Sequence, residues 1–149
     1  PGGESTAIGR LLRVYGLLDI LRNKIMQGMP VYGTCAGLIL LANNVIGETP
    51  HIGTMNISVK RNAYGRQLSS FSCKCFVEEF NKEIPLVFIR APWIEEVNSP
   101  AKVILELDGR IVCARQNNML VSSFHPELTD DVTVHEYFIN MIKKSTYNK

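Results

Sequence analysis

The order of apolar and polar residues along the chain predicts helices near its two ends. Apolar residues recur at helical spacing over residues 5–15, 17–27 and 130–143, as they do on the buried face of an amphipathic helix. Ser5 or Thr6 is expected to cap the first helix, because a hydroxyl can accept a hydrogen bond from the free N–H groups of the first turn. The pattern therefore predicts an N-terminal pair of helices and a C-terminal helix.

Between these helices the pattern changes to the alternation that half-buried strands show. A β pattern is predicted over residues 54–76, where Met55, Ile57 and Val59 alternate with polar neighbours. Further strands are predicted at 31–32, 87–90, 103–107, 111–115 and 120–124. Asp108-Gly109, between two of them, favours a hairpin turn. Strands that alternate with helices predict an α/β fold with a mostly parallel central sheet, extended by antiparallel hairpins, and we expect residues 1–149 to form a single domain.

Composition narrows the class of protein. The chain is 46% hydrophobic and 20% charged, as globular domains are. Its formal net charge of +2 comes from scattered basic residues, which argues against nucleic-acid binding. No apolar run approaches the roughly 20 residues that span a bilayer, so no membrane association is expected. Four cysteines without a secretory signal indicate reduced thiols in a cytoplasmic protein.

Several cysteines and histidines fit ordinary structural roles. Cys73, Cys75 and Cys113 lack a fourth ligand at the spacing of a zinc site, so no metal is expected. His51 and His135 have no acidic neighbour at catalytic spacing except Glu136, which adjoins His135 and faces elsewhere on the predicted helix, and we expect both histidines to lie at the surface.

Glycines flank a cysteine in Gly33-Thr34-Cys35-Ala36-Gly37, between a predicted strand and a helix. Such glycines permit a tight turn and a close approach of the neighbouring backbone. The turn would present the sulfur at the C-terminal edge of the sheet, where open α/β folds bind ligands. It would also place the sulfur at a helix N-terminus, which favours thiolate over thiol. Taken alone, the motif fits a small buried cysteine in a glycine-rich turn equally well.

A second motif, Ser123-Phe124-His125-Pro126-Glu127, ends a predicted strand. The His125 imidazole can take a proton from the Cys35 thiol, and Glu127 can accept a hydrogen bond from the other ring nitrogen. By itself this motif better fits a histidine in a polar turn. Together, the two motifs supply a nucleophile, a base and a group that orients the base, which favours catalysis.

Five segments occur in the order in which a known family carries them. They are Pro1-Gly2-Gly3-Glu4-Ser5-Thr6, Gly33-Thr34-Cys35-Ala36-Gly37, Arg61-Asn62-Ala63-Tyr64-Gly65-Arg66-Gln67, Phe88-Ile89-Arg90-Ala91-Pro92 and Ser123-Phe124-His125-Pro126-Glu127-Leu128-Thr129-Asp130. In these segments the chain resembles the glutaminase subunit of pyridoxal 5'-phosphate synthase, a class I glutamine amidotransferase. Many class I glutaminases share the cysteine and histidine motifs. The first, third and fourth segments are more specific, and they indicate the subfamily.

The resemblance implies a three-layer class I glutaminase-like domain whose chemistry uses no metal or other cofactor. By it, Cys35 attacks the side-chain amide of L-glutamine, His125 moves the proton and Glu127 orients His125. The backbone N–H groups of Gly3 and Ala36 would hold the oxyanion, and each such donor is typically worth about 2.7–4 kcal/mol at the transition state. Ammonia leaves, and water hydrolyses the remaining thioester to glutamate.

The resemblance also implies the contacts of the substrate. Glutamine contacts are carried over from the family to Gly3, Glu4, Ser5, Arg61, Ile89 and Arg90. An arginine fork suits the α-carboxylate of free glutamine, whereas Glu4 or backbone carbonyls suit its α-ammonium. Without the family, Arg61 and Arg90 would fit solvated surface arginines.

A partner protein follows from the same resemblance. The family passes its ammonia through a tunnel to a (β/α)8-barrel synthase subunit in a large hetero-oligomer, and free glutaminase subunits there work poorly until they dock. The family domain has a strand, a helix and a second strand before Pro-Gly-Gly, so we expect this domain to be N-terminally incomplete. Two alternatives stay open: a shortened, catalytically impaired isoform or fragment that acts as a binding or regulatory subunit, and a glutaminase of another amidotransferase.

Overall fold

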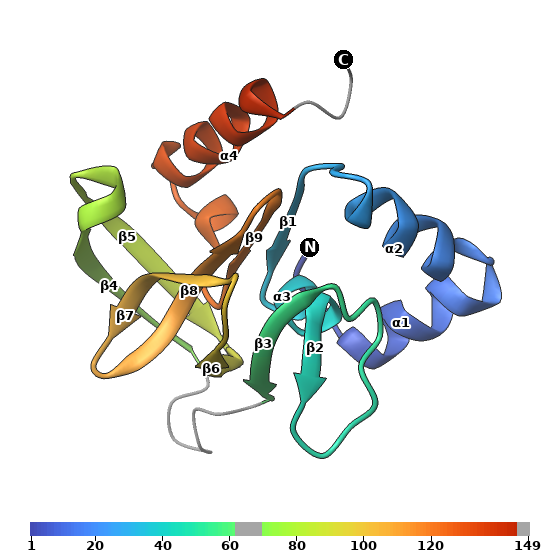
Figure 1. Cartoon of the computed structure of the whole chain (residues 1–149). Coiled ribbons are helices and arrows are strands. Elements are labelled where there is room, and N and C mark those ends of the chain that lie inside the picture. Colours follow the sequence, from blue (N-terminus) through green and yellow to red (C-terminus); the bar gives the residue numbers. More distant parts are fainter. Residues whose placement is uncertain (62–69, 146–149) are drawn as a thin grey trace.

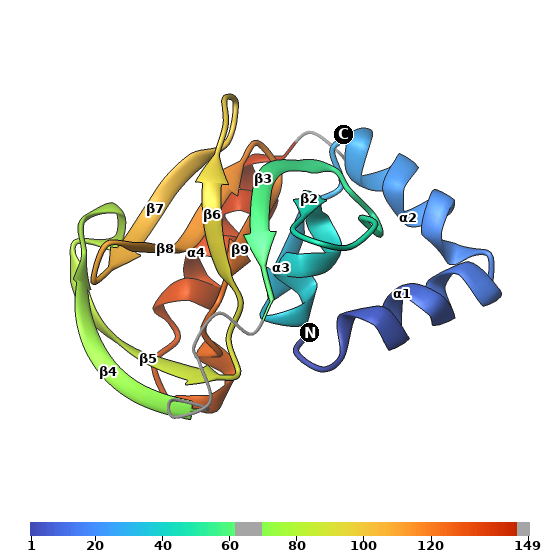
Figure 2. The same cartoon turned by 90° about the horizontal axis from the view of Figure 1, so that it is seen from below.

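A curled seven-stranded sheet runs through the middle of the molecule (Figure 1). The computed structural model describes residues 1–61 and 70–145. The elements are, in chain order, α1 (Ser5–Val14), α2 (Leu17–Met26), β1 (Val31–Thr34), α3 (Ala36–Leu41), β2 (Ala42–Val45), β3 (Met55–Lys60), β4 (Ser70–Val77), η1 (Glu78–Phe80), β5 (Lys82–Ile89), β6 (Trp93–Val97), β7 (Lys102–Leu107), β8 (Arg110–Gln116), β9 (Met119–Ser122), η2 (Pro126–Leu128) and α4 (Thr133–Lys144). Figure 2 shows α1 and α2 on one side of the molecule and the separate β4–β5 hairpin on the opposite side.

The predicted helices are confirmed, but the first has a different cap. The Glu4 carboxylate accepts hydrogen bonds from two backbone N–H groups of the first turn, at 3.0 and 2.7 Å. The prediction of Ser5 or Thr6 as the cap is wrong, because Ser5 already lies inside the helix and is 1% exposed. At the start of α4, Asp131 accepts the Thr133 N–H at 2.9 Å.

The strand order across the sheet is β1-β9-β8-β6-β3-β2, with β7 paired to β8. β1 pairs with β9 and β2 pairs with β3 in parallel, while the pairings of β6, β7 and β8 are antiparallel. The α/β class and the antiparallel extension are therefore confirmed. The β7–β8 turn places Asp108 and Gly109 at φ values of 50° and 72°, the conformation that two-residue hairpins favour.

The sequence pattern did not predict two short strands, β2 and β6. β2 follows α3 directly and carries two adjacent asparagines, Asn43 and Asn44, so it lacks the apolar alternation of a half-buried strand. β6 carries two adjacent glutamates, Glu95 and Glu96, and so lacks the apolar alternation of a half-buried strand.

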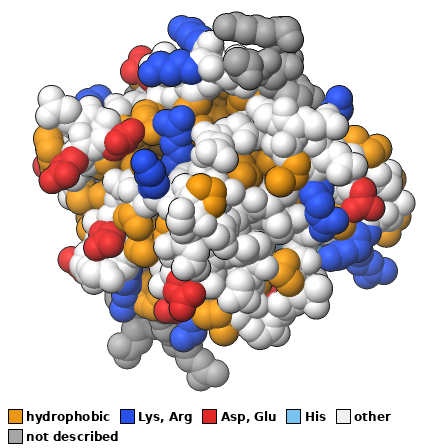
Figure 3. All heavy atoms as spheres, in the orientation of Figure 1, with side chains coloured by type: hydrophobic (Ala, Val, Ile, Leu, Met, Phe, Trp, Pro, Cys, Tyr) orange, Lys and Arg blue, Asp and Glu red, His pale blue; other side chains and the backbone are white. Residues whose placement is uncertain are grey.

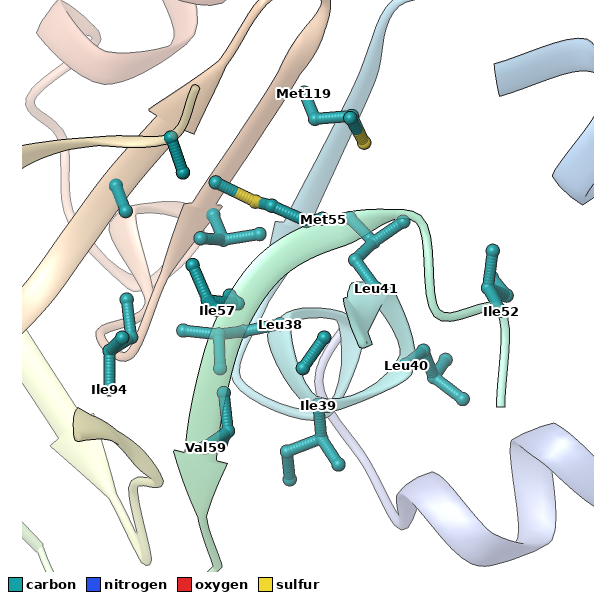
Figure 4. Close-up of a cluster of buried hydrophobic side chains, with 14 of the residues drawn as sticks. Leu38, Ile39, Leu40, Leu41, Ile52, Met55, Ile57, Val59, Ile94 and Met119 are labelled. Atoms are coloured by element: carbon teal, nitrogen blue, oxygen red, sulfur yellow. The ribbon is translucent and has the colours of Figure 1, made fainter. Parts of the chain in front are cut away.

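The sheet separates two hydrophobic cores. On β9, Leu120 belongs to the core beneath α4, while both of its strand neighbours belong to the core that α1, α2 and α3 cover. In the latter core, shown in Figure 4, Met55, Ile57 and Val59 are 0% exposed, which confirms the alternation predicted for β3. Burying one such side chain contributes roughly 1.5–3 kcal/mol. This packing holds α3, and with it the end of β1, in place.

His51 is buried, so the prediction that it lies at the surface is wrong. It is 6% exposed, and its ring lies against α1 at Gly9, where a Cβ would collide with the ring. A glycine inside a helix costs about 1 kcal/mol relative to alanine, and here it makes room for the imidazole. His135 is half-buried, with its ring edge-on to Tyr32 at 6.5 Å between centroids.

The surface carries charges of both signs. On the face shown in Figure 3, basic and acidic side chains are interspersed with apolar patches. Within residues 1–61 and 70–145, no helix has the length and apolar character needed to cross a membrane. In the same ranges, no group of three histidine, cysteine or acidic side chains could hold a metal ion.

Candidate active site

Cys35 lies at the turn between β1 and α3 in a backbone conformation unusual for a residue with a side chain. Its φ is 51° and its ψ is −102°, and its N–H donates to the Ser122 carbonyl on β9 at 2.8 Å. Gly33 allows the turn to close, because a Cβ there would lie 2.6 Å from the carbonyl of Gly37. The tight turn predicted from the glycines is present, and backbone strain of this kind is concentrated at functional sites.

Burial raises the pKa of the Cys35 thiol, since 8% of the residue is exposed. The Ala36 N–H acts in the opposite direction, and the Glu127 carboxylate adds to the increase. The Ala36 N–H thus favours the thiolate, as expected at a helix N-terminus, but the burial of the sulfur has the larger and opposite effect on its pKa. A neighbouring base that accepts the thiol proton would promote reaction of the sulfur.

His125 and Glu127 form a hydrogen-bonded pair just beyond β9. His125 Nδ1 and Glu127 Oε1 are 2.7 Å apart, and the His125 backbone N–H donates to the Val87 carbonyl at 2.8 Å. His125 is 8% exposed. Its Nε2 is buried and has no hydrogen-bond partner among the residues described. The ring is thus oriented through one nitrogen, while the other is left for a reaction partner.

The parallel pairing of β1 with β9 brings the two motifs together. Thr34 pairs with Ser122 in the register of these strands. Cys35 follows one residue after β1, and His125 follows three residues after β9, so both leave the same edge of the sheet. This is the edge at which open α/β sheets bind ligands.

A cavity of about 620 Å³ opens at this edge. The predicted site residues in its lining are Gly3, Glu4, Ser5, Cys35, Arg61, Ile89, Arg90 and His125. Ala36 and Glu127 are not part of the lining: Ala36 is 1% exposed, and Glu127 is bonded to the His125 ring. The structure therefore gathers on one cavity residues that lie far apart in the sequence.

Four further residues line the cavity that were not predicted as site residues: Gly2, Ile39, Pro92 and Leu128. Three of them belong to the motif segments, so their proximity to the site could have been inferred. Ile39 lies in an apolar helical run and has the signature of a core residue.

The backbone at Gly2 and Gly3 passes directly beside the imidazole. A Cβ on Gly2 would lie 2.6 Å from His125 Cε1. Gly3 has a φ of 128°, which residues with side chains rarely adopt. The two glycines are thus required by the geometry of the turn that precedes α1.

Arg61 lies between two carboxylates. Its Nη2 donates to Glu4 at 2.7 Å, and its Nη1 donates to both Glu48 oxygens at 2.8 and 2.9 Å and to the Thr6 hydroxyl at 2.9 Å. Burial lowers the pKa of Arg61, but Glu48 and Glu4 prevail and raise it. The N–H groups of Thr6 and Ala7 lower the pKa of Glu4 to about 2. The pKa shifts of Glu4 and Arg61 both favour the charged forms of these two groups.

The end of β5 forms the opposite wall. Ile89 is 43% exposed, and its carbonyl lies 4.0 Å from the Cys35 sulfur. Arg90 is exposed and has a φ of 45°. The remainder of the predicted Arg61 segment, residues 62–67, lies outside the described residues.

A cysteine turn at the end of one strand, with a His–Glu pair beyond its parallel neighbour, defines an α/β domain of the glutamine amidotransferase class. A solved protein described as "Crystal structure of glutamine amidotransferase" matches with a TM-score of 0.91 and 42% sequence identity, over 96% of this chain and 77% of that chain. The chain belongs to the SNO glutamine amidotransferase family, whose model matches residues 1–144.

Three similar sequences carry the description "Pyridoxal 5'-phosphate synthase subunit PdxT". The protein of Carboxydothermus hydrogenoformans is 53% identical over 146 residues, which cover 97% of this chain and 76% of that protein. That of Streptococcus pneumoniae is 51% identical over 147 residues, covering 98% of this chain and 76% of the relative. That of Clostridium beijerinckii is 52% identical over 141 residues, covering 93% and 74%.

Proposed function

We propose that the chain hydrolyses L-glutamine to glutamate and ammonia, and that this ammonia is used to make pyridoxal 5'-phosphate, a form of vitamin B6. Family membership and the PdxT relatives support the reaction and its purpose. The observation that carries the mechanism is the arrangement of two side chains on one cavity. Cys35 and His125 both line it, and Glu127 holds the far nitrogen of the imidazole at 2.7 Å.

In the first half of the reaction, Cys35 is the nucleophile. His125 Nε2 takes the proton from the sulfur as the sulfur forms a bond to the amide carbon of the glutamine side chain. The carbonyl electrons move to oxygen, where the N–H groups of Gly3 and Ala36 stabilise the negative charge. Glu127 stabilises the imidazolium through Nδ1.

In the second half, the amide is exchanged for water. The oxyanion reforms the carbonyl, the carbon–nitrogen bond breaks, and His125 returns its proton to the nitrogen, which leaves as ammonia. A thioester to Cys35 remains. Water, deprotonated by His125, then attacks this carbon, the carbon–sulfur bond breaks, and the proton returns to the thiol. The sum is glutamine plus water giving glutamate plus ammonia, without a change of oxidation state.

The walls of the cavity offer groups for the rest of the substrate. Arg61 and Arg90 suit the α-carboxylate, and Glu4 suits the α-ammonium. The Ser5 hydroxyl is buried and has no partner in the part of the chain that the structure describes, so a substrate can supply one. The Ile89 carbonyl, 4.0 Å from the Cys35 sulfur, adds a further acceptor.

We also propose that the chain works with a synthase subunit. The relatives are named as subunits of pyridoxal 5'-phosphate synthase, which supports a partnership of this kind. The finer expectation is that this partner is a (β/α)8 barrel within a large hetero-oligomer, and that the 149 residues act as one glutaminase domain.

Ammonia release and covalent labelling test the proposal. With the synthase subunit present, the chain should release ammonia from glutamine, and Cys35→Ser should abolish the release without unfolding the protein. Cys73→Ser is the matched control and should retain activity, because Cys73 is half-buried and not part of the cavity lining. A diazo-ketone analogue of glutamine should add one equivalent at Cys35. Labelling spread over all the cysteines according to exposure would refute the role of Cys35.

A further inference from the structure

Glu48 lies on the loop between β2 and β3, beside the cavity but not in its lining. Both of its carboxylate oxygens accept from one nitrogen of Arg61, at 2.8 and 2.9 Å. The second terminal nitrogen of Arg61 donates to Glu4 at 2.7 Å. Glu48, Arg61 and Glu4 therefore form a chain of charges that leads from the loop to the start of α1.

This series of ion pairs ends at Glu4, next to the turn that contains Gly3. Glu4 accepts from the N–H groups of Thr6 and Ala7 and so fixes the first turn of α1. Gly3 precedes it directly and has the φ of 128° that places it in the cavity wall. A shift of Glu4 therefore changes the direction of the backbone at Gly3.

The loop that presents Glu48 is anchored to both N-terminal helices. The His51 ring packs on Gly9, and Arg13 lies 3.4 Å from its Nδ1. Arg22 donates to the carbonyls of His51 and Ile52 at 2.8 and 2.7 Å. These contacts fix the position of Glu48 relative to α1 and α2. They therefore also fix where the Glu48 carboxylate meets the Arg61 guanidinium.

Glu48 is expected to affect the positions of the site groups more than the free energy of unfolding. Its side chain is 35% exposed and that of Arg61 is 24% exposed, and ion pairs that are open to water are worth about 0–1 kcal/mol. By contrast, a misplacement of about 1 Å in a catalytic group can cost roughly 100-fold in rate. Loss of Glu48 should therefore lower activity far more than it lowers the melting temperature.

We propose that Glu48 is a positioning residue for glutamine hydrolysis. It holds Arg61 against Glu4 and thereby fixes the Gly2–Gly3 turn, so that the Gly3 N–H meets the oxyanion. This inference rests on the proposed function, because it assumes that Gly3 stabilises the transition state. Glu48 itself touches no reacting atom and acts through Arg61.

Kinetics in the complex with the synthase subunit test this role. Glu48→Gln keeps the shape of the side chain and removes its charge, and it should lower kcat about tenfold, with a smaller change in KM. Glu48→Asp, which keeps the charge, should recover part of the loss. The control Glu83→Gln changes an exposed glutamate on β5 and should have the activity of the wild type. In an Arg61→Ala background, Glu48→Gln should cost less than about twofold.

Two kinetic results would overturn the inference. One is a kcat for Glu48→Gln equal to that of Glu83→Gln. The other is a tenfold loss that persists in the Arg61→Ala background, since Glu48 would then act by another route.

Hydrogen exchange separates this inference from the proposed function. The amides of Thr6 and Ala7 should exchange several-fold faster in Glu48→Gln than in Glu83→Gln, because their acceptor Glu4 is less well held. Unchanged exchange would overturn the inference even if the enzyme is active. A wild-type complex that releases no ammonia would refute the proposed function, and the exchange rates would still decide whether Glu48 holds α1.

Discussion

Gly2 has no room for a side chain, because His125 Cε1 occupies the space in which its Cβ would lie. The same closeness links two motifs that the sequence places at opposite ends of the chain. The turn before α1 and the imidazole therefore define each other's position, and a change at one residue is transmitted to the other.

Gly2→Ala should reduce ammonia release by at least about tenfold, because the added methyl displaces the ring by which the proton is moved. The melting temperature should change little, since the turn lies at the surface of the cavity and outside both cores. Steady-state kinetics and thermal unfolding measure the two effects. Wild-type activity in Gly2→Ala would show that the ring has more freedom than its contacts indicate.

The unequal contacts of His125 and Glu127 predict unequal effects of their loss. His125→Ala should cost nearly as much activity as Cys35→Ser, because the members of such a group act as a unit. Glu127→Gln should retain more activity, since an amide oxygen can still accept the Nδ1 hydrogen bond measured at 2.7 Å. The comparison is of kcat in the complex with the synthase subunit, and equal kcat for His125→Ala and the wild type would refute the assignment.

Among the elements, α1 contains a glycine, Gly9, that disfavours a helix but is needed for a contact with the His51 ring. Gly9 lowers the helix propensity of α1, yet its missing side chain lets the buried His51 ring pack on the helix. The loop between β2 and β3 is held to α1 in this way.

Gly9→Ala should destabilise the protein, although the same change in an open helix stabilises by about 1 kcal/mol. The methyl group would collide with the His51 ring and push the loop away from α1. In a His51→Ala background the collision is absent, and Gly9→Ala should become neutral or stabilising. Urea unfolding of the four proteins measures this coupling, and additive effects would contradict the contact.

For the molecule as a whole, the cavity lining includes exposed apolar side chains beside its charged groups. Ile89 and Leu128 are 43% and 55% exposed, and exposed apolar surface often marks a contact with another protein. Gly2 and Gly3 line the same cavity, where a docked protein could restrict their turn.

Addition of a synthase subunit should therefore raise the rate of ammonia release at least about tenfold, which corresponds to roughly 1.4 kcal/mol of barrier. Ordering of the glycine turn by the partner is the physical reason, since glycine leaves the free turn many conformations. An unrelated barrel protein serves as the control and should have no effect. Equal rates with and without the synthase subunit would show that the turn is already ordered in the free chain.

The sequence by itself determined the elements and the chemistry of the motifs. Helical and strand periods depend on neighbours within a few residues, so α1, α2, α4 and the β7–β8 hairpin could be predicted. The same holds for the cysteine turn, because its flanking glycines predict a tight turn from the local sequence alone. β2 and β6 could not be predicted, because each carries two adjacent polar residues that interrupt the alternation of a half-buried strand.

The tertiary structure alone decided how these parts act on one another. The register of β1 with β9 brings Cys35 and His125 to one edge, and burial raises the pKa of the Cys35 thiol despite the Ala36 N–H. Packing across the chain also buries His51 and places Glu48 on Arg61. Desolvation and long-range contacts depend on which distant segments of the chain pack together. A local pattern of residues contains no information about that packing.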